Sequence, residues 1–170
     1  LKLNSKGDIT KTGEVWRNRE MYIGKSSPVV VGERVYAVDD KGNLLIIDLK
    51  TGKQLGREKL GTMGRASLLY ADGKLYTCEG NGRWAIFKIT DDGLERIHKM
   101  RLDGDVSASP IISHGRLYVT TGAGMYCIGN KDAKPAASPR PEPKAEAAVG
   151  FDMEPAHVQV VPVDTLLKGG

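Results

Sequence analysis

One segment returns three times along the chain and constrains its fold more than any other feature. Each copy has an opening Ser, a short apolar run, a turn and a second run that ends in Tyr: Ser27–Tyr36, Ser67–Tyr76 and Ser109–Tyr118. The copies are 40 and then 42 residues apart. A period of this size is typical of stacked units that are each too small to bury their own apolar surface. The sequence therefore predicts an array of similar units.

A further apolar run follows each copy, after turns rich in Gly and Asp. Such turns indicate strands joined by tight hairpins. The strands that end in Tyr are apolar on both faces, so we expect each sheet to be covered on both sides by its neighbours. Four antiparallel strands per unit at a period near 40 residues predict an all-β fold of β-propeller blades. In the run after the second strand, Leu44 and Ile46 of the first unit correspond to Trp84 and Ile86 of the second unit and to Tyr126 and Ile128 of the third unit.

The chain is expected to divide into three parts. Residues 1–129 are predicted to form a partial propeller, with a preceding outer strand over 14–18 and blades over 27–60, 66–102 and 108–128. Residues 130–155 are rich in Pro, Ala, Lys and Glu, which predicts an extended linker that is mobile over 131–154. Residues 156–170 are interpreted as the start of a truncated β domain.

The third blade has only three predicted strands. Neither end of the sequence resembles a natural boundary, so we expect a fragment of a larger chain. A strand upstream of Leu1 is predicted to complete the blade beside Met125–Ile128, because ring closure removes a free sheet edge.

The repeats resemble the pyrroloquinoline-quinone-like (PQQ-like) β-propeller family over residues 7–129. The resemblance rests on Ser-Pro before the inner strand, Gly-Arg-Leu-Tyr over 115–118, and Asp48-Leu-Lys-Thr-Gly-Lys53. The leading segment over 7–12 and Trp16 resemble a segment of large exported bacterial propellers. The family usually has a docking Trp four residues after the Gly of the Asp-x-x-Thr-Gly turn, where this chain has Gly56. Blade docking is therefore expected from other repeat residues: Trp84, Tyr36, Tyr76, Tyr118, Ser27, Ser67 and Ser109.

The resemblance implies two classes of function. One is a non-catalytic scaffold or binding module with protein partners, similar to the propeller lipoproteins of outer-membrane barrel assembly. Such a module would be periplasmic, envelope-associated or secreted, and would pack against the remaining blades of its own chain. The alternative is part of a quinone-dependent oxidoreductase whose PQQ and calcium site lies in blades outside this sequence.

Candidate chemical groups favour the first class. Quinone-dependent dehydrogenases of the superfamily carry a vicinal Cys pair, which this sequence lacks. Its acidic candidates fall in hairpin turns, where they are interpreted as turn formers. We therefore expect no catalytic or metal-ligating residue in this sequence. The acidic residues in hairpin turns are Asp39, Asp40, Asp72 and Asp92, and Asp103-Gly-Asp105 is the only near-candidate for a loop of oxygen ligands to a metal.

Charge and cysteine content exclude further classes. The formal net charge of +4 comes from scattered residues with no block of like charge, so a nucleic-acid partner is not expected. No apolar run reaches the roughly 18 residues of a membrane span. Cys78 aligns with Val38, and Cys127 with Leu45 and Ala85, so both are predicted to be small buried hydrophobes.

Overall fold

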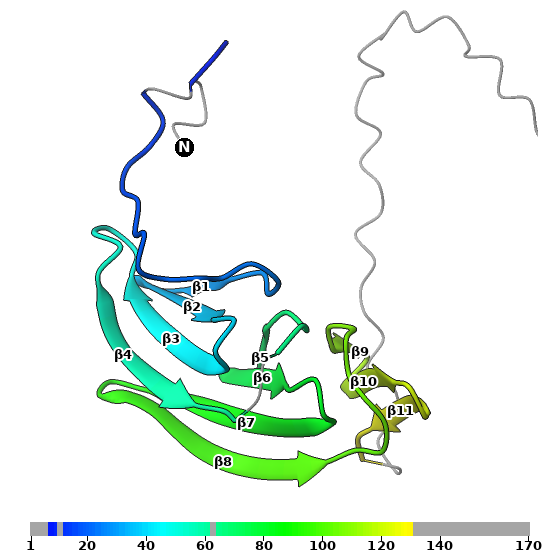
Figure 1. The fold of residues 1–170 in the computed structure, drawn as a ribbon. Helices are drawn as coiled ribbons and strands as arrows, with labels where there is room; N and C mark the ends of the chain where they lie inside the picture. Colours follow the sequence, from blue (N-terminus) through cyan, green and yellow to red (C-terminus); the bar gives the residue numbers. More distant parts are fainter. Residues whose placement is uncertain (1–6, 10–11, 62–63, 131–170) are drawn as a thin grey trace, which may run out of the picture. The chain divides into compact units, whose positions relative to one another are not determined.

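The described part of the chain folds into three antiparallel sheets (Figure 1). The computed structural model describes residues 7–9, 12–61 and 64–130, which lie in the first of the chain's two units, Leu1–Ala137. The first sheet contains β1 (Val29–Val31), β2 (Arg34–Val38), β3 (Asn43–Asp48) and β4 (Gln54–Lys59). The second contains β5 (Leu69–Ala71), β6 (Lys74–Cys78), β7 (Arg83–Thr90) and β8 (Gly93–Arg101). The third contains β9 (Ile111–Ser113), β10 (Arg116–Thr121) and β11 (Gly124–Ile128).

The prediction of an all-β fold with blade-like antiparallel sheets is confirmed. Each strand pairs with the next one along the chain, so that β4 and β8 are the outer strands of the first two sheets. The predicted linker beyond residue 130, its predicted mobility and the predicted domain over 156–170 lie outside the described residues.

Tight hairpins join the first two strands of each sheet. In the second sheet Asp72 and Gly73 have φ of 50° and 67°, and in the third sheet His114 and Gly115 have φ of 52° and 70°. Two successive residues with positive φ form the turn whose twist matches that of the flanking strands. Asp72 and His114 therefore occupy the same turn position in their repeats, and both adopt the positive φ that this turn requires.

The two four-stranded sheets also share an irregularity in their outer strands. The pairing of β3 with β4 shifts between Ile46 and Ile47, and that of β7 with β8 shifts between Ile86 and Phe87. These positions are equivalent in the repeat. A bulge of this kind bends the strand and increases its local twist.

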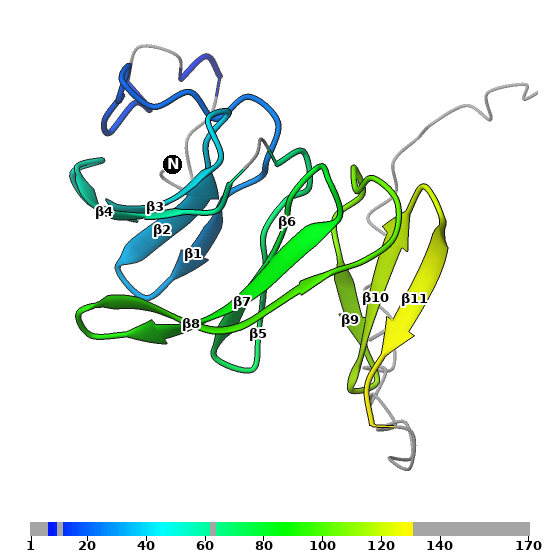
Figure 2. The ribbon, with the colours of Figure 1, turned by 60° about the horizontal axis from the view of Figure 1, so that its bottom comes forward.

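Neighbouring sheets lie side by side (Figure 2), and the core consists of apolar layers between them. One cluster joins Tyr36 and Ile46 of the first sheet to Leu75 and Phe87 of the second sheet. Another joins Trp84 of the second sheet to residues of the third sheet, including Val119. The second sheet thus buries side chains on both of its faces. This double burial explains the apolar residues on both faces of its strands, which the sequence indicated.

The segment before the first sheet corrects one prediction. Residues 14–18 form no strand. Trp16, Met21 and Ile23 instead pack on the face of the first sheet that points away from the second sheet. This segment covers Val35, Ala37, Leu45 and Ile47, which are all buried.

The third sheet corrects a second prediction, because its register differs by one residue from the expected alignment. Tyr36 pairs with Ile46, and Tyr76 with Ile86, but Tyr118 pairs with Cys127. Four residues separate the paired Thr120 and Met125, whereas five separate the equivalent pair Val38 and Leu44, so the connection before β11 is one residue shorter. A slip of one residue moves every side chain of a strand to the opposite face.

The slip explains where the side chains of β11 lie. Tyr126 and Ile128 pack toward the second sheet, beside Val119 and Leu117. Met125 lies on the other face and is 71% exposed. That other face of the third sheet is exposed in the described part of the chain.

Candidate blade-docking site

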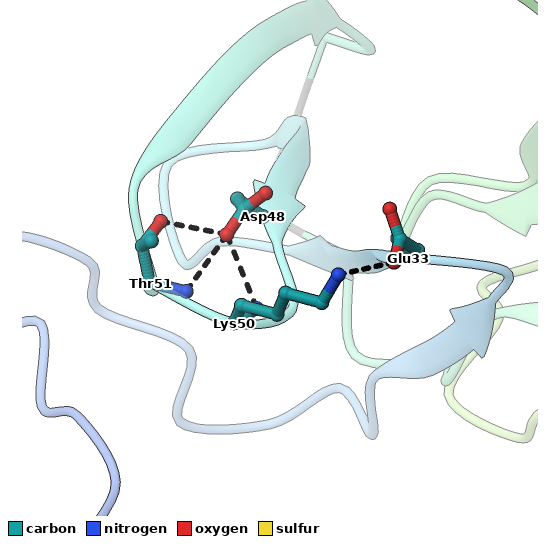
Figure 3. Close-up of polar contacts among 4 residues, drawn as sticks. All are labelled: Glu33, Asp48, Lys50 and Thr51. Carbon is teal, nitrogen blue, oxygen red and sulfur yellow. Dashed lines mark hydrogen bonds and ion pairs between the residues drawn. The ribbon is translucent and has the colours of Figure 1, made fainter.

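A polar turn after β3 forms the first part of the docking site (Figure 3). The Asp48 carboxylate accepts hydrogen bonds from the backbone N–H of Lys50 at 3.1 Å and of Thr51 at 2.7 Å. It also accepts one from the Thr51 hydroxyl at 2.7 Å. These bonds, chiefly those from Thr51, hold the pKa of Asp48 below its ordinary value.

The same turn is tied to the β1–β2 hairpin. The Lys50 ammonium pairs with the Glu33 carboxylate, which raises the pKa of Lys50 (Figure 3). The backbone N–H of Leu49 donates to Glu33 O at 2.9 Å. The turn is thereby held against the edge of its own sheet.

Trp16 docks on this turn from the preceding segment. Its indole Nε1–H donates to Leu49 O at 2.8 Å, and the Asn18 side-chain amide donates to Gly52 O at 3.1 Å. Gly52 has a φ of 68°, and a Cβ built there would lie 2.4 Å from atoms of the Trp16 ring. Only glycine allows both this backbone conformation and this close approach of the ring.

Docking by Trp16 was missed in the sequence analysis. The available signal was the Thr12-Gly13 pair three residues before Trp16, which resembles the Thr51-Gly52 turn. The family pattern, counted from Gly52, instead places the docking position at Gly56.

The three repeat serines connect the three sheets in sequence. The backbone N–H of Ser27 donates to Ser67 Oγ at 2.9 Å. The backbone N–H of Ser67 donates to Ser109 Oγ at 2.8 Å. The structure therefore brings these predicted site residues together as one hydrogen-bonded series, in which each unit donates to the next.

Two arginines add contacts between the first and second sheets. The Arg34 guanidinium donates to Thr90 O at 3.1 Å and to Asp91 O at 2.7 Å. Arg96 donates to Lys59 O at 2.8 Å, and its guanidinium lies 5.2 Å from the centroid of the Phe87 ring. The hydrogen bond to Lys59 O joins β8 to the first sheet, and the guanidinium over the Phe87 ring is a favourable contact within the second sheet.

The predicted aromatic residues occupy three different environments. Tyr36 and Trp84 are fully buried, in the first and second apolar layers respectively. Tyr76 is half-buried, and its ring centroid lies 6.1 Å from that of Trp84. Tyr118 is also half-buried and lies on the outward face of the third sheet, paired with Cys127. Their role in blade docking stays a proposal.

The two cysteines differ in solvent exposure, although the sequence predicted that both are buried. Cys78 is a buried free thiol, and burial raises its pKa to about 12. Cys127 is also free but exposed, so its predicted burial is wrong. The prediction failed because the register slip places Cys127 opposite Tyr118 rather than at the place of Ala85.

The acidic residues of the hairpin turns hold the backbone. The Asp39 carboxylate accepts hydrogen bonds from the backbone N–H groups of Lys41 and Asn43 at 2.9 Å and 2.8 Å. Asp40 accepts one from the backbone N–H of Gly24 at 3.3 Å.

Among residues 7–9, 12–61 and 64–130, no three His, Cys, Asp or Glu side chains form a metal-binding group. The same ranges contain no helix of the length and apolarity that a bilayer span requires.

A match to a known protein family identifies the repeated unit. A sequence profile of the family described as outer membrane protein assembly factor BamB matches residues 8–136. This span contains all the strands of the described residues. The chain belongs to the PQQ-like, BamB-type β-propeller repeat family. The resemblance found in the sequence is confirmed.

A sequence relative and a solved structure each match this BamB-type chain over part of their own length. The outer membrane protein assembly factor BamB of Burkholderia pseudomallei (strain K96243) is 34% identical over 95 residues, which are 56% of this chain and 24% of the relative. The matched part thus spans about a quarter of the relative's length. The crystal structure of BamB from Moraxella catarrhalis matches with a TM-score of 0.55 and 15% identity, over 68% of this chain and 39% of that chain. At this identity the structural similarity shows the fold alone.

Proposed function

We propose that the intact protein is a non-catalytic propeller scaffold of the bacterial cell envelope that binds protein partners during the assembly of outer-membrane proteins. The observation that carries the proposal is the family match over residues 8–136, whose description is an outer membrane protein assembly factor. The 34% identity to the BamB of Burkholderia pseudomallei supports the same role. Fold alone would not, because one fold supports many functions.

The geometry of the repeats supports a structural role for the groups that could otherwise be catalytic. The carboxylates of Asp39 and Asp48 each accept hydrogen bonds within a turn. The repeat serines link neighbouring sheets through their hydroxyl and backbone groups. These residue types are therefore used to build a rigid surface, which is what a binding scaffold requires.

Deletion of the gene in its parent bacterium tests the proposal. We expect a lower fraction of folded outer-membrane barrel proteins, measured by their heat-modifiable mobility, and recovery on complementation with the wild-type gene. An unchanged fraction of folded barrels would overturn the assembly role.

A second assay tests the non-catalytic part of the proposal. The purified intact protein is incubated with PQQ and calcium, and cofactor absorbance and dye reduction are measured. We expect neither signal above that of the protein alone. Dye reduction that depends on added quinone would overturn the scaffold role and favour a quinone-dependent oxidoreductase.

A further inference from the structure

Three cationic residues gather on one face of β7 and β8, the last two strands of the second sheet (Figure 1). Arg83 pairs directly with Arg101, and Lys99 pairs with Ala85, two residues along from Arg83. Because side chains two residues apart lie on the same face of a strand, the three cationic side chains share one face. All three residues are exposed. They are called the β8 cation cluster below.

No acidic side chain in the described part of the chain neutralises the β8 cation cluster. Glu95 is the only acidic residue of β7 and β8, and it pairs with Lys88 on the opposite face of the sheet. Like charges directly opposite each other destabilise a sheet, as Arg83 and Arg101 do here. The ion pairs among the described residues lie elsewhere and join Arg17 to Glu14, Lys50 to Glu33, and Lys74 to Asp72.

The equivalent place in the first sheet has its polar groups paired. Asn43 and Lys59 pair there as their counterparts do in the second sheet. The Asn43 side-chain amide donates to the Asp39 carboxylate at 2.7 Å, and the Lys59 ammonium donates to Lys41 O at 2.9 Å. The side chains of the β8 cation cluster have no such partner among the described residues. The unneutralised charge is therefore specific to the second sheet and is not a general property of the repeat.

Beside the cluster, β8 also has a free backbone edge. Among the described residues β8 pairs only with β7. The pairing shifts at Ile97, which is 43% exposed, and is regular from His98 to Arg101. In this regular stretch, alternate N–H and C=O groups point away from β7. An edge of this kind can pair with an added strand.

We propose that the edge of β8 from His98 to Arg101 binds an acidic, extended segment of a protein partner by strand addition. The inference rests on the proposed function, which assigns protein partners to the scaffold. Lys99 and Arg101 are two residues apart, so an added strand with two carboxylates at the same spacing presents both on the face of these cations. Opposite charges at neighbouring cross-strand positions stabilise a sheet, and Arg forms strong charge-assisted hydrogen bonds with carboxylates.

The two faces of β8 specify the side chains of the added strand. The residue between its two carboxylates lies on the other face, beside the partly buried Met100, and is therefore expected to be apolar. Strands β7 and β8 together contain five Lys or Arg residues and one Glu, which favours the approach of an acidic segment. An anionic lipid headgroup would also neutralise the cations, but it cannot form the ladder of hydrogen bonds that an extended peptide forms along a strand edge.

Binding of a labelled eight-residue peptide that alternates Glu and Val to the purified intact protein, measured by fluorescence anisotropy, tests the proposal. We expect saturable binding that weakens as the salt concentration rises. Lys99→Gln combined with Arg101→Gln should raise the Kd at least about 10-fold. The matched control, Lys88→Gln combined with Arg57→Gln, removes the same charge from exposed sites outside the cluster and should change the Kd less than about twofold. Absence of binding, or an equal loss in both double variants, would overturn the proposal.

Hydrogen exchange at saturating peptide tests the strand addition itself. We expect alternate amides from His98 to Arg101 to exchange at least about 10-fold more slowly than without peptide. The amides of β4, the outer strand of the first sheet, serve as the reference and should be unchanged. Binding without slower exchange in β8 would overturn the proposal.

A vesicle assay tests the lipid alternative. The intact protein is sedimented with vesicles of phosphatidylethanolamine and phosphatidylglycerol. Sedimentation that is lost in the Lys99→Gln, Arg101→Gln variant, with no binding of the peptide, would assign the edge to an anionic membrane surface and overturn the proposal. Failure of the peptide to bind would leave the gene-deletion test of the proposed function unaffected, so the two failures are distinguishable.

Discussion

The two interfaces between neighbouring sheets use equivalent repeat positions but are filled to different degrees. Between the first and second sheets, Tyr36 and Phe87 are fully buried and Ile46 is 6% exposed. Between the second and third sheets, Trp84 is 1% exposed, yet Ile86 lines a hollow. The inner strands thus suffice to bury the middle of an interface. The outer part of the first interface also contains Ile89 and Leu94, from the end of β7 and the start of β8.

Trp84→Ala should cause the largest loss, because it removes the main buried side chain of the second interface. We expect the free energy of unfolding to fall by about 3 to 5 kcal/mol, as for other buried aromatic residues truncated to Ala. Chemical denaturation measures this loss. The control is Met125→Ala, which truncates a side chain that is 71% exposed and should change stability by less than about 0.5 kcal/mol. A loss below about 1 kcal/mol for Trp84→Ala would contradict the burial of this interface.

Gly52→Ala should cost about 2 to 4 kcal/mol, because the new Cβ both meets the Trp16 ring and adopts a positive φ. The matched control is Gly73→Ala, where φ is 67° and no atom lies within 4 Å of the added Cβ. There only the backbone term remains, about 1 kcal/mol. Equal losses for the two variants, measured by denaturation, would show that Trp16 does not dock on Gly52.

Ser67→Ala should cost about 1 kcal/mol, because it removes the hydroxyl acceptor of the Ser27 N–H. The control Ser107→Ala changes an exposed serine between the second and third sheets and should be neutral. Denaturation of both variants compares them directly. If Ser67→Ala were as neutral as the control, the serine series would carry no measurable part of the docking energy.

Tyr36→Phe should have the smallest effect and the opposite sign. The Tyr36 hydroxyl is buried without a hydrogen-bond partner in the structure. Removing a buried, unpaired hydroxyl should leave stability unchanged or raise it by up to about 1 kcal/mol. Tyr70→Phe, at an exposed site, should be neutral. A loss of more than about 1 kcal/mol for Tyr36→Phe would reveal a hydrogen bond at this hydroxyl.

The sequence predicted the parts of the fold that repeat locally. Turn residues and alternating apolar runs repeat with the period, and the structure has the corresponding antiparallel sheets. The register of β11 could not be predicted in this way, because apolar residues lie on both of its faces. Tyr126 and Ile128 lie on one face, and Met125 and Cys127 on the other. In either register, an apolar pair would therefore face the second sheet.

The docking contacts were predicted only in part. Ser27, Ser67 and Ser109 were selected because they recur, and the structure joins them by hydrogen bonds. The contact of Trp16 with Gly52 joins segments more than 30 residues apart, and only one of its partners belongs to a complete repeat. Periodicity could not reveal it, because Trp16 lies before the first of the three repeated segments.

Paired truncations at Ile46 and Ile86 in the intact protein test the central claim most directly, namely that neighbouring sheets pack as equivalent blades and that the fourth strand predicted from the sequence completes the second interface. If a strand covers Ile86 as β8 and its hairpin cover Ile46, both Ile→Ala variants should lose about 2 to 4 kcal/mol of unfolding free energy. The two losses should agree within about 1 kcal/mol. A loss at Ile86 below half of that at Ile46 would show that Ile86 still faces an open hollow, and would contradict the account.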